Sequence, residues 1–127
     1  MAKCAFAFVS VNIDEVEASL VSELRLTSLQ AKVFLLIVKG GKKSSQEIAK
    51  GLGVSDLQAL EVAKSLVNLG GFIDITDTEF ESTHPRFAVV NMYRRMCMRE
   101  NIPFKKNLLV DNISIVLEKP YDDARTK

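Results

Sequence analysis

The sequence predicts an α+β fold, mostly α, in the form of a winged helix-turn-helix with extra N- and C-terminal helices. Three helix-start signals follow one another between residues 27 and 58, and each helix that they open ends at glycine. Residues 72–76 and 80–83 then predict two short strands joined by a turn. Helices joined by short glycine-containing turns and followed by a hairpin are typical of a winged helix.

Length and composition predict one globular domain. The 127 residues fit a single winged-helix domain with its core at 24–83 and flanking helices at about 13–24, 85–100 and 107–118. Hydrophobic residues make up 47% and charged residues 26%, which are globular rather than disordered values. The 17 Lys and Arg residues nearly balance the 16 Asp and Glu residues. A strongly basic nucleic-acid coat is therefore excluded, although a local basic face is not.

The ends of the chain and its compartment are predicted as follows. Residues 4–11 fit a short strand, and residues 13–24 fit a helix capped by Asn12. The longest central apolar run, Val33–Val38, is far short of the ~20 residues that cross a bilayer. Acidic residues crowd the place where a signal peptide would be cleaved. We therefore expect a cytoplasmic protein with two free thiols and no membrane contact.

The three central helices open on capping boxes, in which a Ser or Thr side chain and a Gln or Glu side chain bond each other's backbone N–H groups. The pairs are Thr27 with Gln30, Ser44 with Glu47, and Ser55 with Gln58. Behind the first box, Leu29, Val33, Leu36 and Ile37 fall on one helical face. The helices are ended by Gly40-Gly41, by Gly53 and by Gly70-Gly71.

The helix after the hairpin begins at Pro85, with His84 as its expected cap, and should run to about Glu100. One side of it is apolar, and we assign it as a homodimer interface, with burial in the core as the alternative: Val89, Met92, Tyr93 and Met96. Cys97 lies on the same side and is expected to be an inert buried thiol. The segment 107–118 fits a helix, with a strand as the alternative.

Several short motifs carry a family resemblance. They are Leu26–Phe34, Ser45–Ala49, Gly53–Ser55, Leu60–Val62, Leu66 and Leu69-Gly70. Together they resemble the archaeal TrmB-type regulator domain over about residues 24–83. The resemblance implies a dimeric, DNA-binding transcriptional regulator. It does not carry over sugar sensing, because the chain is too short for the C-terminal sugar-binding domain of larger members.

The sequence departs from the family pattern in three ways. Gly71 stands where an aliphatic residue is usual, and Asp56 opens a helix that is often basic. Asp77 and Glu79 in the wing would repel phosphate.

The third helix carries the candidate base-reading residues. Gln58 is suited to an adenine edge, Ser65 to several bases, and Lys64 to phosphate. Two lysines precede the second helix, whose N-terminus can hold a phosphate. The predicted DNA-binding residues are Lys42, Lys43, Ser55, Gln58, Glu61, Lys64, Ser65 and Asn68. The alternative is an ordinary solvated helix face.

Four arginines lie on or near the fourth helix: Arg86, Arg94, Arg95 and Arg99. We favour pairing within the chain or with a partner, for example with Glu100 or Asp111, over contact with DNA. No nucleophile motif, metal-spaced cluster or phosphate loop is recognisable, so we expect no enzyme, no metal and no cofactor.

The sequence therefore predicts a homodimeric regulator that binds double-stranded DNA with its third helix in the major groove. The alternative is a winged helix used for protein contact within the transcription machinery, without strong DNA binding. The near-zero net charge and the acidic wing favour this alternative.

Overall fold

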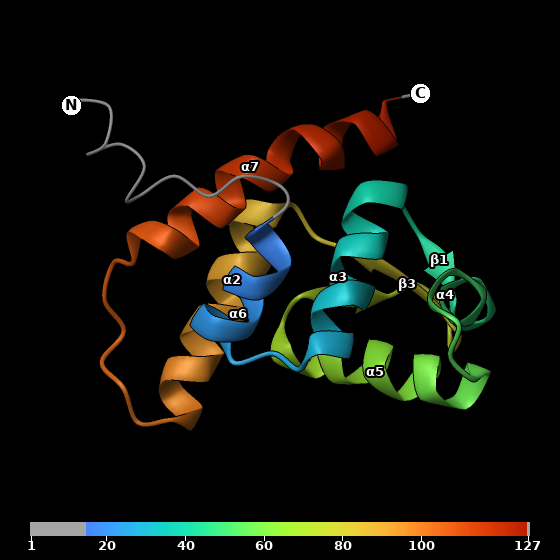
Figure 1. The fold of residues 1–127 in the computed structure, drawn as a ribbon, viewed down its shortest axis with the longest axis horizontal. Coiled ribbons are helices and arrows are strands. Elements are labelled where there is room, and N and C mark those ends of the chain that lie inside the picture. Colours follow the sequence, from blue (N-terminus) through green and yellow to red (C-terminus); the bar gives the residue numbers. More distant parts are fainter. Residues whose placement is uncertain (1–14, 127) are drawn as a thin grey trace.

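The computed structural model describes residues 15–126, so the predicted strand at 4–11 and the predicted cap Asn12 lie outside the described residues. The described part is mostly helical, with one small antiparallel sheet, as the sequence predicts at the level of fold class (Figure 1). In chain order its elements are α2 (Val16–Leu24), α3 (Ser28–Gly40), β1 (Lys43–Ser44), α4 (Ser45–Leu52), α5 (Asp56–Leu69), β2 (Phe72–Asp74), β3 (Glu79–Ser82), α6 (Pro85–Arg99) and α7 (Leu108–Arg125).

The helix starts follow the predicted chemistry. At α3, the Thr27 hydroxyl accepts from the Gln30 backbone N–H at 3.1 Å, and Gln30 Oε1 accepts from the Thr27 backbone N–H at 2.9 Å. Ser44 and Glu47 form the same reciprocal box at α4. At α5, the Ser55 hydroxyl accepts from the Gln58 backbone N–H at 3.1 Å, without a return bond from the Gln58 side chain in the described structure. The predicted third box is therefore a simple serine cap.

The sheet has three strands in the order β1-β3-β2, all antiparallel. Lys43 lies opposite Phe80 on one side of β3, and Phe72 lies opposite Ser82 on the other. Both predicted strands are present. The first is shorter than predicted, because the Ile75 and Thr76 N–H groups already turn to the Glu79 carbonyl, and the second begins and ends one residue earlier than predicted. Strand β1 was not predicted, since two residues are too few to show an alternating pattern.

The core lies around α3, which packs against α2, α5, α7 and the sheet. Phe34 is fully buried, and its ring stacks on Phe72 from β2 at 5.9 Å between centroids. Gly71 leaves a gap that α6 fills: a Cβ placed on Gly71 would lie 2.7 Å from Met92 Sδ. The missing aliphatic side chain at position 71 is thus replaced by a methionine from another helix.

The apolar side of α6 faces the chain's own core. Val89, Met92, Tyr93 and Met96 are 0%, 1%, 9% and 4% exposed, and Cys97 is buried beside them. Burial also raises the pKa of the Tyr93 phenol above its ordinary value. These four side chains are not accessible to a second copy, so their assignment as a dimer interface is wrong and the core alternative holds. The physical reason is that α6 packs against α7, α2 and α5 within the same chain.

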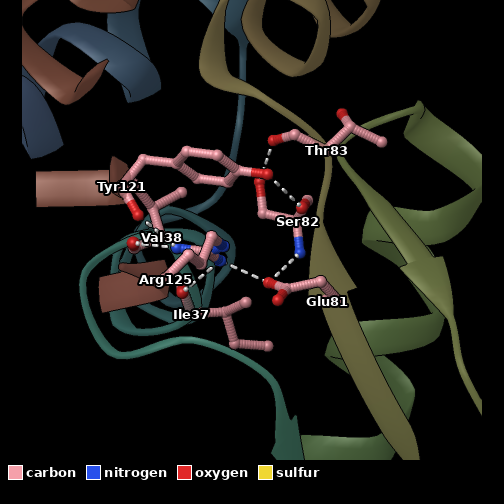
Figure 2. Close-up of polar contacts among 7 residues, drawn as sticks. All are labelled: Ile37, Val38, Glu81, Ser82, Thr83, Tyr121 and Arg125. Carbon is pink, nitrogen blue, oxygen red and sulfur yellow. Dashed lines mark hydrogen bonds and ion pairs between the residues drawn. The ribbon is translucent and has the colours of Figure 1, made fainter. Parts of the chain in front are cut away.

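Helix α7 confirms the helical prediction for 107–118 and continues past it, through Pro120, to Arg125. Its last turn is held by a cluster of polar contacts, shown in Figure 2. The Arg125 guanidinium donates to the carbonyls of Ile37 and Val38, at 3.1 and 2.9 Å, at the C-terminal end of α3. It also pairs with the Glu81 carboxylate on β3. A cation at a helix C-terminus opposes the partial negative charge of the helix dipole.

Tyr121 completes the cluster. Its ring lies 3.7 Å beneath the Arg125 guanidinium, and its hydroxyl donates to the Ser82 carbonyl at 3.5 Å (Figure 2). The end of α7 is thereby fastened both to α3 and to the sheet, which explains why the helix extends to Arg125.

Candidate nucleic-acid interface

Helices α4 and α5 pack against each other across a short turn. Gly53 ends α4 with φ of 68°, a left-handed conformation that glycine adopts without strain. The Val54 N–H donates back to the Ala49 carbonyl at 3.1 Å, and Ser55 then caps α5. Two capped helices follow each other here within three residues of turn, as the motif predicts.

Helix α5 buries one side and exposes the other. Ala59, Ala63 and Leu66 are buried against the core. Most of the predicted contact stripe is exposed: Gln58, Glu61, Lys64 and Asn68, together with Ser55 at the start of the helix. The structure therefore brings these residues onto one accessible surface.

Ser65 is the exception on this helix. It is half-buried, its hydroxyl accepts from Gln30 Nε2 at 3.0 Å, and it donates to the Val62 carbonyl at 2.6 Å. Ser65 thus ties α5 to α3 and is not free to read bases, which corrects its assignment. Helical spacing placed Ser65 at the edge of the stripe, where a small difference in angle around the helix decides whether a side chain faces solvent or the core.

The two lysines before α4 differ in their surroundings. Lys42 is exposed, whereas Lys43 is half-buried in β1. The Lys43 stem lies over Gly40, so that a Cβ on Gly40 would be 2.9 Å from Lys43 Cε. Backbone and side-chain hydrogen bonds from Ser44 lower the pKa of Glu47, and the charges of Lys43 and Lys42 act in the same direction. A carboxylate therefore stands beside the two lysines at the start of α4.

The loop between β2 and β3 is acidic and is fastened to α4. The Ser45 N–H donates to the Thr78 carbonyl at 2.8 Å. Between this loop and α5 lies an open cleft of about 310 Å³. Its lining includes one lysine and two aspartates: Lys64, Asp74 and Asp77. The cleft thus offers more negative than positive charge.

The arginines of α6 have partners within the chain. Arg86 forms a two-bond contact with Glu118 on α7, with both nitrogen–oxygen distances at 3.1 Å. Arg95 donates to the Asn68 carbonyl at the end of α5, and Arg94 donates to Asn91 at 2.9 Å. Arg99 lies 3.9 Å from Glu100. These side chains therefore pair within the chain, as the favoured interpretation of the sequence expects.

The remaining candidates fill structural roles. His84 accepts from the Arg86 backbone N–H at 3.2 Å, which confirms it as the cap of α6.

Within residues 15–126, no group of three His, Cys, Asp or Glu side chains could hold a metal ion. No helix in that part of the chain is both long enough and apolar enough to span a bilayer.

Comparison of the sequence with protein-family models and with curated proteins, and of the structure with solved structures, finds no match.

Proposed function

We propose that the chain is a winged helix-turn-helix protein that binds double-stranded DNA through α5, as one half of a homodimer. The observation that carries this proposal is the order of elements: α3, β1, α4, α5, β2 and β3, with β1 pairing with β3 on the side opposite β2. In a winged helix, the β-hairpin is the wing and the last helix before it is the recognition helix. Here β2 and β3 would form the wing and α5 would be the recognition helix.

The exposed residues of α5 supply the contacts. Gln58 and Asn68 have side-chain amides that suit base edges, and Lys64 suits phosphate. Lys42 and Lys43 flank the N-terminus of α4, where backbone N–H groups also attract phosphate. Two such faces in a dimer would read half-sites about one helical turn apart.

Charge reversal tests the proposed face. Lys43→Glu and Lys64→Glu should each weaken binding to duplex DNA at low salt, because each change removes a positive charge from a phosphate and adds repulsion. Fluorescence anisotropy measures the effect. The negative slope of log affinity against log salt should become shallower by about 0.9 for each phosphate that is no longer neutralised. Lys119→Glu, at an exposed position on α7, is the matched control and should leave affinity unchanged. Equal affinities for all three variants would rule out this face.

A second candidate is a protein contact through the same surface. The observation that favours it is the acidic surface around α5 and the wing, with Asp56, Glu61, Asp74 and Asp77 exposed. Phosphates lying along this surface would meet several carboxylates, which weakens nucleic-acid binding.

Asp77→Lys separates the two candidates. If the wing lies along DNA, removing the negative charge and adding a positive one should tighten binding at low salt. If the surface binds a protein instead, the wild-type chain and Asp77→Lys should both fail to bind duplex DNA. The same anisotropy titration distinguishes these results.

A further inference from the structure

The charge of the chain changes sign at the junction between β3 and α6. Residues 72–82, which form the hairpin of β2 and β3, hold four acidic side chains and no basic one. Residues 84–107, which include α6, hold six basic side chains and one acidic side chain. Because α5 contacts both β2 and α6, the helix that is proposed to bind DNA has an acidic neighbour and a basic neighbour.

The acidic neighbour lies along the exposed side of α5. Lys64 and Asn68 on α5 line the cleft that they share with Asp74 and Asp77 from the hairpin. A phosphate placed in this cleft would meet two carboxylates for one lysine, and like charges repel. The side of α5 that faces the wing is therefore unfavourable for the backbone of bound DNA.

The basic neighbour meets α5 at its C-terminal end, where α5 runs up to α6 (Figure 1). The Arg95 guanidinium donates to the Asn68 carbonyl, and a Cβ placed on Gly70 would lie 3.3 Å from Arg95 Nε. The free carbonyl groups at the end of a helix carry partial negative charge, which would repel a phosphate, and Arg95 offsets that charge here. Lys64 lies one turn before Asn68, so exposed polar side chains follow one another from Lys64 through Asn68 to Arg95.

Arg94 and Arg95 are exposed and bond to neutral groups. Arg94 donates to the side-chain oxygen of Asn91, whereas the partner of Arg95 is a backbone carbonyl. These bonds therefore do not cancel the two positive charges. Arg86 differs, because it forms a two-bond contact with the Glu118 carboxylate. An exposed guanidinium with a neutral partner has N–H groups left over for a phosphate, to which it binds strongly.

We propose that Arg94 and Arg95 bind backbone phosphates of the duplex that α5 contacts, so that the phosphate-binding surface continues from α5 onto α6 rather than along the wing. The inference rests on the proposed function, because it names where the same DNA runs. Arginine suits this role, since its planar guanidinium can hold a phosphate through two parallel N–H groups. A phosphate contact carries no base information, so this surface adds affinity for duplex DNA of any sequence.

Removal of each charge tests the α6 surface. Arg94→Gln and Arg95→Gln should each weaken binding to duplex DNA by roughly tenfold at about 50 mM salt, and each should make the negative slope of log affinity against log salt shallower by about 0.9. Arg86→Gln is the matched control, because it changes the net charge equally but removes a charge that already pairs with Glu118. It should leave affinity and slope unchanged. Arg95→Lys keeps the charge and should keep the wild-type slope, which separates a phosphate contact from support of the Asn68 carbonyl.

The outcomes separate this inference from the proposed function. A shallower slope in Arg94→Gln and Arg95→Gln, with the wild-type slope kept in Arg95→Lys and Arg86→Gln, would support the α6 surface. Wild-type binding with an unchanged slope in both glutamine variants, or with an equal loss in Arg86→Gln, would overturn the α6 surface and leave DNA binding by α5 standing. A wild-type chain that binds no duplex DNA at about 50 mM salt would overturn both.

Discussion

Gly71 and Met92 show how a single residue depends on a distant helix. The Met92 sulfur occupies the space in which an aliphatic side chain at position 71 would sit. The sequence alone marks Gly71 as unusual, but it does not show what fills the gap, because Met92 is on a different element. Protein cores are close-packed, so the space between Gly71 and Met92 leaves little room for one more methyl group.

Adding that methyl group should destabilise the fold. Gly71→Ala would place a Cβ 2.7 Å from Met92 Sδ, and we expect it to lower the free energy of unfolding by about 1–3 kcal/mol. Gly51→Ala is the matched control. Gly51 lies in α4, and a Cβ on it would meet the Leu36 side chain of α3 at an ordinary contact distance of 3.4 Å. That substitution should raise the free energy of unfolding by roughly 0.5–1 kcal/mol. Urea denaturation measures both changes, and a loss of stability in both variants would contradict this view of the packing.

At the scale of elements, local signals predicted the capped starts of the three central helices and their ends at glycine, but not the end of α7. Thr27, Ser44 and Ser55 cap their helices through bonds to residues three positions ahead, which a sequence can show. The end of α7 depends on Ile37, Val38 and Glu81, all distant in the chain, so a helix end predicted at 118 falls short. Strand β1 likewise exists only because β3 lies beside it.

The contacts of Arg125 should make the end of α7 a stabilising element. Arg125→Met would remove four hydrogen bonds and leave the Glu81 carboxylate without this partner. We expect a loss of about 2 kcal/mol in the free energy of unfolding, since charged hydrogen bonds contribute about 1.5–3 kcal/mol and the site is partly exposed.

A control on the same helix isolates the effect. Lys119→Met removes a solvent-exposed ion pair with Asp123, and such pairs contribute about 0–1 kcal/mol. Hydrogen exchange should accelerate at the end of α7 and in β3 for Arg125→Met and not for Lys119→Met. Equal stabilities for the two variants would show that the contacts around Arg125 do not hold α7 in place.

At the scale of the whole molecule, the sequence predicted most of the polar surface of α5 and misplaced one face of α6. Helical spacing identified Gln58, Lys64 and Asn68 as exposed, and it erred on Ser65 at the edge of the stripe. On α6 the apolar side was recognised, but the choice between core and partner depends on where α2, α5 and α7 lie. Tertiary packing decides such a choice, and periodicity does not carry that information.

The most direct test of DNA binding by the α4–α5 face is the salt dependence of wild-type affinity. Fluorescence anisotropy with a genomic duplex library at about 50 and about 200 mM salt covers the range in which phosphate contacts lose strength. We expect binding at the lower salt that weakens steeply at the higher, with retained fragments enriched in a two-fold repeated site. Failure to bind at about 50 mM salt would contradict the DNA proposal and leave protein contact as the function of this surface.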